Sequence, residues 1–134
     1  MNVLKNVKIQ NIKDSKGHLL ICEINNQIDF IAKRFYVISE VPENVDRGNH
    51  GHKTLEQIIV CLEGSFELYV HNGVKFDIVT LSKQSSAVYL PAGCWRELRN
   101  FKNNSICLVL ASEPFDSNDY VNSFEKFIEW KNSV

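Results

Sequence analysis

Hydrophobic and polar residues alternate along much of this chain. The clearest case runs from residue 65 to residue 71, where the apolar Phe66, Leu68 and Val70 are separated by more polar residues. A period of two is typical of a strand with one buried face. Other short apolar runs bounded by turn residues predict strands over 3–12, 19–24, 30–38, 57–62, 74–81, 87–90, 95–101 and 106–111. Many short strands separated by turn signals indicate a sandwich or barrel.

Two local signals add detail to this all-β pattern. Asn72-Gly73 is a strong hairpin signal, and the strand before Gly64 is expected to end at that glycine. Past Pro114 the period changes to that of a helix, with Asn118 or Asp119 as its cap. The apolar stripe of this helix follows i, i+4, i+7 and i+8 spacing: Tyr120, Phe124, Phe127 and Ile128. We expect it to pack against the barrel.

Composition narrows the class of protein. The length of 134 residues suits one domain spanning 1–134, and the net charge of −1 with no long basic run argues against a nucleic-acid partner. No apolar run approaches the length of a membrane span, and the first residues lack the order of a secretory signal. The 4 cysteines form no C-x-x-C pair, which favours reduced thiols in a cytoplasmic protein.

Two of the 4 histidines, His50 and His52, are separated by one residue. On a strand, residues i and i+2 point to the same face, so both imidazoles should share one space. An H-x-H pair is also the first half of the cupin site pattern. That pattern continues with a Glu and a Gly, and a second part reads P-x-G-x-x-H-x-x-x-N.

Both parts of the cupin pattern are present with their residue spacing, but two of the expected ligand residues are replaced by other types. Gln57 stands where the Glu ligand is expected, and Arg96 stands where the last His is expected. An amide is a poor substitute for a carboxylate, and a guanidinium is a permanent cation without a lone pair. We therefore expect no metal. Glu56, one residue off the frame, is the remaining candidate ligand if the strand bulges there.

Without a metal, two histidines in a barrel mouth suit proton transfer, because their ordinary pKa of about 6.5 lies near neutral pH. Proton transfer beside a carbonyl needs a base, an acid and donors to the developing enolate oxygen. His50 and His52 could supply the first two, and Arg96, Gln57 and Tyr36 are candidates for the third.

Outside the two parts of the cupin pattern, the evidence for site residues is weaker. Arg34, two residues before Tyr36, could hold a diphosphate or be a solvated edge charge. Trp95 and Tyr69 could stack on a base or sugar, although aromatic residues on strands are more often core.

Over nearly its whole length the chain resembles the dTDP-4-oxo-6-deoxyglucose 3,4-ketoisomerases, which are small sugar-isomerase cupins. The resemblance is carried by Asp14-Ser15-Lys16-Gly17, Lys33-Arg34-Phe35-Tyr36, Arg47-Gly48-Asn49-His50-Gly51-His52-Lys53, Glu56-Gln57, Cys61-Leu62-Glu63-Gly64-Ser65, Pro91-Ala92-Gly93-Cys94-Trp95-Arg96-Glu97, Val109-Leu110-Ala111-Ser112 and Asp119-Tyr120. It implies a cupin-type jelly-roll barrel with a C-terminal α-helix.

The resemblance also implies a function. The keto group of a nucleotide-linked sugar would move from C4′ to C3′ through an enediol, without a metal or other cofactor. His50 and His52 would transfer the protons, with Arg34, Tyr36 and Arg47 near the substrate. Family members form homodimers that exchange N-terminal strands, and their products lead to 3-amino-3,6-dideoxy sugars.

Two positions depart from some relatives. Lys16 replaces an arginine and Arg96 replaces a histidine. Both are expected to line the substrate site near C4′, and the change at Arg96 favours a gluco over a galacto product.

Other functions remain open from the residues alone. A sugar-nucleotide epimerase-like cupin is one, although such an enzyme typically uses a His–Asp pair with a tyrosine acid. A non-catalytic cupin that binds a sugar or small acid is another. A metal-dependent oxygenase is the weakest, because of Gln57 and Arg96.

Overall fold

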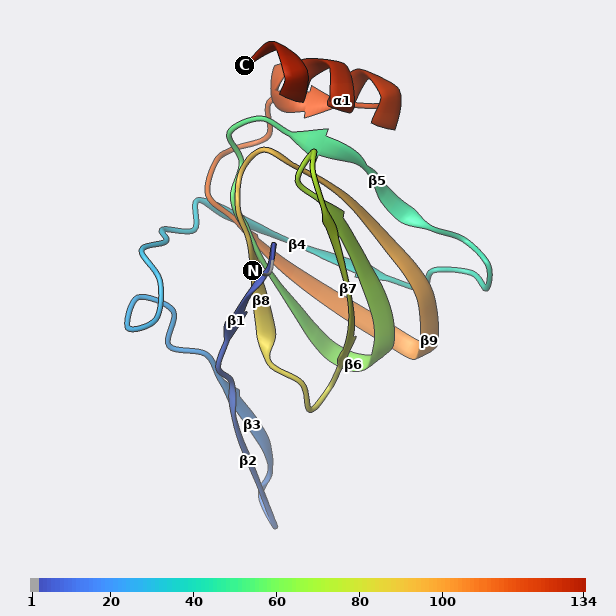
Figure 1. Ribbon diagram of the computed structural model, residues 1–134. Helices are drawn as coiled ribbons and strands as arrows, with labels where there is room; N and C mark the ends of the chain where they lie inside the picture. The colour runs from blue at the N-terminus through green and yellow to red at the C-terminus, as the bar shows by residue number, and fades with distance from the viewer. Residues whose placement is uncertain (1–2) are drawn as a thin grey trace.

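The computed structural model describes residues 3–134, which form an all-β barrel with one C-terminal helix (Figure 1). The elements are β1 (Lys5–Val7), β2 (Gln10–Asp14), β3 (Gly17–Ile21), β4 (Arg34–Ser39), β5 (Arg47–His52), β6 (Gln57–His71), β7 (Phe76–Ser82), β8 (Ala87–Leu90), β9 (Cys94–Ala111), a 3-10 turn (Ser117–Asp119), β10 (Tyr120–Val121) and α1 (Phe124–Ser133).

The long strands β6 and β9 each contribute to two facing layers. The first part of β6 pairs with β8 and with the end of β9, whereas its last part pairs with β7 and with the start of β9. β1 extends the first layer beside β8, and β4 joins it at the end of β9. β5 and β10 extend the second layer. Apolar side chains between the layers form the main core, with Phe66, Leu68 and Leu98 almost fully buried.

Both long strands bend where the layers meet, and two predicted strand ends are therefore wrong. β6 continues through Gly64, which has a φ of 69°, and residues 95–101 and 106–111 belong to one strand, β9. The bend of β9 contains Asn100, Asn103 and Asn104, all with positive φ. Glycine and asparagine adopt this left-handed backbone most readily, so the chain turns without leaving the ladder.

The C-terminal helix begins later than its pattern predicts. Its cap is Ser123, whose hydroxyl accepts a hydrogen bond from the Lys126 backbone N–H at 3.1 Å. Asn118 and Asp119 lie in the 3-10 turn, and Tyr120 lies in β10, where it pairs with His52. The predicted start was wrong because this pairing holds the chain extended. The packing was predicted correctly, since Phe127 is fully buried beside Trp95.

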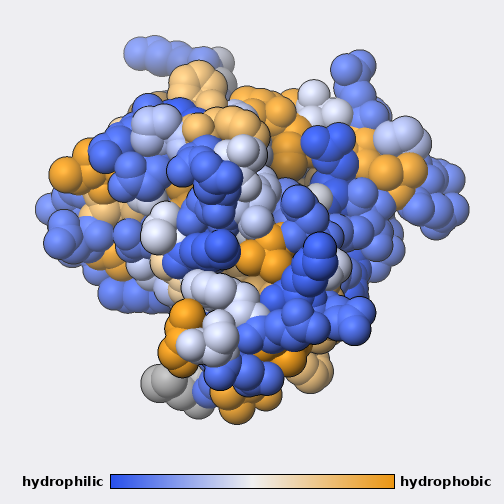
Figure 2. Space-filling model, turned by 90° about the horizontal axis from the view of Figure 1, so that it is seen from above, coloured by the Kyte–Doolittle hydropathy of each residue, from blue (hydrophilic) through white to orange (hydrophobic). Residues whose placement is uncertain are grey.

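The β2–β3 hairpin projects away from the barrel (Figure 1). Ile12 and Leu19 are cross-strand neighbours on it and are 39% and 55% exposed. The end of the molecule that carries α1 is covered mainly by hydrophilic residues, with apolar ones in separate groups (Figure 2). Within residues 3–134, no helix combines the length and apolar character needed to cross a bilayer.

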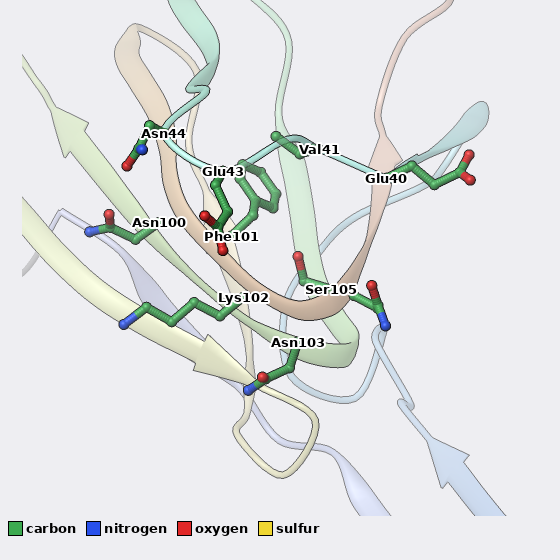
Figure 3. Close-up of a pocket in the computed structure, with 10 residues that line it drawn as sticks. Glu40, Val41, Glu43, Asn44, Asn100, Phe101, Lys102, Asn103 and Ser105 are labelled. Carbon is green, nitrogen blue, oxygen red and sulfur yellow. The ribbon is translucent and has the colours of Figure 1, made fainter.

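A depression of about 440 Å³ lies where the β4–β5 connection faces the bend of β9 (Figure 3). Its lining is mostly polar and includes Glu43, Asn44 and Lys102. It contains none of the predicted site residues. Its shape follows from the bent backbone, and we assign it no chemistry.

Candidate active site

His50 and His52 point to the same side of β5, as their spacing predicts. Their ring centroids lie 4.9 Å apart with the planes at 89°. Tyr120 covers the pair from β10, with its ring centroid 4.8 Å from that of His50 and 4.5 Å from that of His52. His52 is the deeper of the two, with only 3% of its surface exposed.

The residues that replace the expected metal ligands share one hydrogen-bond acceptor, the hydroxyl of Tyr36. Gln57 Nε2 donates to this oxygen at 2.9 Å and Arg96 Nη2 donates at 2.8 Å. The same Nη2 lies 3.5 Å from His50 Nε2. Because both neighbours donate, the Tyr36 oxygen acts as acceptor and its own proton remains available to a ligand.

A cavity of about 260 Å³ opens beside these groups. Six of its lining residues carry polar side chains of the site: Arg34, Tyr36, Arg47, His50, Arg96 and Tyr120. Arg34 is held there by a hydrogen bond from Nε to the Glu113 carbonyl oxygen at 2.9 Å. The structure therefore brings together seven of the eight predicted site residues, if Gln57 and His52 are counted through their contacts with Tyr36 and His50.

Lys16 is the predicted residue that the structure does not bring to this cluster. It lies in the turn of the projecting β2–β3 hairpin, where its backbone N–H bonds to Asp14 Oδ1. The prediction that it lines the site is therefore not met within one chain. Trp95 and Tyr69 also lie outside the cavity lining: Trp95 packs on α1, and Tyr69 stacks on Phe76.

Two residues of the cluster were not predicted as site residues, namely Asp119 and Tyr120. Asp119 Oδ2 lies 3.6 Å from His52 Nδ1, and Tyr120 lines the cavity. The helix pattern placed Asp119 at the cap and Tyr120 in the apolar stripe of the predicted helix. Their position in the Asp119-Tyr120 motif was the one signal in the chain that could have pointed to them.

Several buried polar atoms of the cluster have no hydrogen-bond partner among the described residues. They are His52 Nδ1 and Nε2, Gln57 Oε1, and Arg96 Nε and Nη1. Buried polar groups are normally hydrogen-bonded, and leaving one unpaired costs about 1–3 kcal/mol. Such a concentration beside a cavity indicates a place where a polar ligand would supply the missing partners.

Burial keeps both histidines neutral. It lowers the pKa of His50 from 6.5 to about 4, and the Arg96 guanidinium acts in the same direction. Burial lowers the pKa of His52 to about 2, reinforced by the charges of Arg96, His50 and Arg34. The Asp119 carboxylate lies 3.6 Å from His52 Nδ1, beyond hydrogen-bond distance, so burial dominates and His52 is neutral at pH 7.

These lowered pKa values predict a pH-dependent stability. Between pH 6.5 and about 4 the unfolded chain binds more protons at these two sites than the folded chain. Their contribution to the free energy of unfolding is therefore complete above pH 6.5 and is lost as the pH falls. The loss is at most ~1.4 kcal/mol per pH unit for each histidine, and it is smaller for the partly exposed His50. Urea unfolding at pH 7 and pH 5 measures this change in stability. The double variant His50→Asn/His52→Asn should show a shallower dependence, and equal slopes would contradict the assignment.

The donor set does not fit the transition metal that cupin sites commonly hold. Arg96 places a permanent positive charge 3.5 Å from His50 Nε2, and a cation there would repel a metal ion. Glu56 does not take the place of the missing carboxylate, because it accepts a hydrogen bond from the Tyr89 hydroxyl. The chemistry of the site must therefore come from its side chains.

Sequence comparisons agree with this geometry. A family model described as FdtA: WxcM-like, C-terminal matches residues 2–132. The TDP-4-oxo-6-deoxy-alpha-D-glucose-3,4-oxoisomerase of Aneurinibacillus thermoaerophilus is 34% identical over 123 residues, which cover 92% of this chain and 88% of that protein. The chain belongs to the sugar-nucleotide 3,4-ketoisomerase family.

Solved ketoisomerase structures share the whole fold. A histidine-to-asparagine variant of QdtA from Thermoanaerobacterium thermosaccharolyticum, in complex with TDP-4-keto-6-deoxyglucose, has a TM-score of 0.89 and 32% identity, covering 99% of this chain and 96% of that one. The WlaRB TDP-quinovose 3,4-ketoisomerase from Campylobacter jejuni has a TM-score of 0.85 and 30% identity, covering 96% of this chain and 99% of that one. The cupin-type fold expected for the ketoisomerase family is confirmed.

Proposed function

We propose that this protein converts dTDP-4-oxo-6-deoxy-D-glucose into the 3-oxo sugar without a metal ion. The observation that carries the proposal is the cluster of His50, His52, Tyr36, Gln57 and Arg96 beside a cavity, with buried polar atoms that lack partners. TDP-4-keto-6-deoxyglucose, the ligand bound in the structure of the QdtA variant, supports the choice of sugar. Arg34 and Arg47 on the cavity wall suit the diphosphate, since guanidinium groups bind phosphate oxygens in pairs.

The reaction needs one proton to move between carbons. A neutral histidine removes the C3′ proton, and the C–H electron pair forms the C3′–C4′ double bond of an enediolate. Negative charge then develops on the C4′ oxygen, where the Tyr36 hydroxyl and the Arg96 guanidinium can donate hydrogen bonds. The proton of the C3′ hydroxyl moves to the C4′ oxygen, and protonation of C4′ then completes the neutral 3-oxo sugar with its C4′ hydroxyl.

Incubation with dTDP-4-oxo-6-deoxyglucose in deuterated water tests this proposal. We expect a new 3-oxo sugar with deuterium at C4′, or deuterium at C3′ of the remaining 4-oxo sugar, both detected by NMR. A ligand that binds but is neither exchanged nor converted would favour a non-catalytic binding protein.

We propose the gluco configuration for the product. In the gluco sugar the C3′ and C4′ hydrogens lie on opposite ring faces, so return of a proton to the face from which it was taken would give galacto. Arg96 cannot relay a proton, because a guanidinium remains charged at neutral pH. The likeness to a TDP-quinovose ketoisomerase supports a gluco product, since quinovose is 6-deoxyglucose.

Arg96→His tests this stereochemistry. The wild type should give the gluco 3-oxo sugar, read from the coupling between the C4′ and C5′ protons. The variant should give a measurable galacto fraction, because an imidazole at this position can return a proton to the ring face from which it was taken. A galacto product from both proteins would overturn the assignment.

We propose that the protein is a homodimer in which N-terminal strands are exchanged. β1 pairs with β8 of its own chain, so the β2–β3 hairpin is the part that could reach a partner. The exposed pair Ile12 and Leu19 would then be covered, and Lys16 would be carried to the partner's site. Light scattering should give the mass of two chains, and the mass of one chain would contradict the dimer.

Three broader predictions stay proposals. The match of a single family model to residues 2–132 supports one domain spanning 1–134. The 3-oxo product would suit a PLP-dependent aminotransferase, in a route to 3-amino-3,6-dideoxy sugars. A cytoplasmic location remains a prediction.

One observation favours a sugar-nucleotide epimerase as the second candidate. His52, Asp119 and Tyr120 lie together, which is the His–Asp and tyrosine combination expected of that class. An epimerase would exchange carbon-bound protons in deuterated water but leave the keto group at C4′. The same NMR experiment therefore distinguishes the two.

A further inference from the structure

The hydroxyl of Tyr36 is held from both layers of the barrel. Gln57, the first residue of β6, reaches it from the layer that also contains β4, whereas Arg96 reaches it from the start of β9 in the other layer. The two hydrogen bonds measure 2.9 and 2.8 Å. The Arg34 guanidinium lies 5.5 Å from the centre of the Tyr36 ring. The position of the hydroxyl is therefore fixed by contacts on several sides.

Every hydrogen-bond partner of this hydroxyl among residues 3–134 is a donor. Gln57 donates from Nε2 and Arg96 donates from Nη2, and no acceptor in this part of the chain is bonded to the Tyr36 oxygen. Two donors occupy both lone pairs of a hydroxyl oxygen, so its O–H bond must point away from both of them. Tyr36 lines the cavity of the site, and the O–H is left to point into that cavity.

Gln57 does not line the cavity itself. It is 1% exposed, and within the described chain its side chain forms one hydrogen bond, to Tyr36. The sequence suggested Gln57 as a direct donor to the substrate oxygen. The structure instead gives its amide a route to the substrate only through the Tyr36 hydroxyl.

A carboxylate at this position would reverse the hydrogen bond. A carboxylate can only accept, so it would take the proton of Tyr36 and turn the O–H away from the cavity. Glutamate is the residue that the cupin pattern expects here, and this chain has the amide of nearly the same shape. The replacement therefore does more than remove a metal ligand, because it sets the direction of the neighbouring O–H.

We propose that Gln57 is a positioning residue that keeps the Tyr36 O–H directed at the C4′ oxygen of the sugar. This inference rests on the proposed ketoisomerase function. As the C3′ proton is removed, negative charge develops on the C4′ oxygen, and Tyr36 donates a hydrogen bond to it without losing its own proton. A donor fixed in this direction stabilises the enediolate more than the ketone, which lowers the barrier.

Gln57→Glu and Gln57→Met separate the direction of the hydrogen bond from packing. Glutamate keeps the shape of glutamine, whereas methionine keeps the length and offers no donor. Near pH 8, where the Arg96 guanidinium favours an ionised carboxylate, Gln57→Glu should lower kcat by about a hundredfold, as for loss of an oxyanion donor. Gln57→Met should lower kcat by less than about tenfold, because the Tyr36 O–H stays free to reach the cavity. A packing role predicts the opposite order.

A double-mutant cycle asks whether Gln57 acts through Tyr36. Tyr36→Phe alone should lower kcat by about a hundredfold. In the Tyr36→Phe protein, Gln57→Met should cause no further loss, because the group that Gln57 positions is gone. A loss as large as that in the wild-type background would show that Gln57 acts independently of Tyr36 and would overturn the proposal.

The matched control is Gln84→Glu, which adds the same charge at an exposed position in the β7–β8 connection. Its kcat should stay near that of the wild type. TDP affinity, measured by calorimetry, should change little in all these variants, so that the losses lie in kcat. EDTA in every assay keeps a new carboxylate from recruiting a metal ion beside the histidines.

Three results would count against the positioning role or the function beneath it. A kcat of Gln57→Glu equal to or above that of Gln57→Met would overturn the positioning role. If Gln57→Glu binds no TDP, the double-mutant cycle decides, since it needs no buried charge. A wild type without isomerase turnover would instead overturn the proposed function and, with it, the role of Gln57.

Discussion

His52→Asn is expected to lower the isomerase rate by at least about a thousandfold, near the upper range for loss of a group that transfers protons. An asparagine amide cannot take up or release a proton at neutral pH, so one of the two histidines proposed to move protons would be lost. His52 is 3% exposed and has no hydrogen-bond partner in the described chain, so the substitution breaks no existing bond. Deuterium exchange and product formation measured by NMR give the rate.

The control for this variant is the same substitution outside the site. His71→Asn changes a histidine at the end of β6, whose Nδ1 accepts a hydrogen bond from the Gly73 N–H. Its turnover should match that of the wild type. TDP affinity, measured by calorimetry, should change little in both variants. Turnover of His52→Asn within tenfold of the wild type would contradict the assigned chemistry.

Gly64→Ala is expected to lower the free energy of unfolding by about 3–5 kcal/mol, which combines backbone strain with overpacking. Gly64 has a φ of 69° at the bend of β6. A Cβ there would overlap the Lys102 carbonyl oxygen and lie 2.7 Å from Ser105 Cα and 2.9 Å from the Asn103 carbonyl oxygen. These are backbone atoms of the β9 bend, so they cannot move aside as a side chain would.

Gly17→Ala separates the cost of backbone strain from the cost of overpacking. Gly17 also has a positive φ, of 122°, but a Cβ there would meet nothing within 4 Å. Its cost should be limited to backbone strain, about 1–3 kcal/mol. Urea unfolding followed by circular dichroism compares the two variants. A Gly64→Ala protein as stable as Gly17→Ala would show that the two bends are not tightly packed.

The strand pattern was predictable because one face of most strands is buried. Residues 65–71 alternate in the sequence, and in β6 Phe66, Leu68 and Val70 are buried as expected. The continuity of β6 and β9 was not predictable, because glycine and asparagine signal turns as well as bends within a strand. The start of α1 was missed for a different reason: Tyr120 fits a helical stripe but pairs with His52 instead.

The sequence alone determined which chemical groups are available to this protein. It showed two histidines at i, i+2 on one strand, and Gln57 and Arg96 in place of the usual ligands. Tertiary structure decided how they meet: Gln57 and Arg96 both donate to Tyr36, and Asp119 lies opposite His52. These contacts join β4, β5, β6, β9 and the segment before α1, which are distant in the chain. Local periodicity reports which face of a strand is buried, whereas tautomers and hydrogen-bond partners depend on groups that only folding brings within reach.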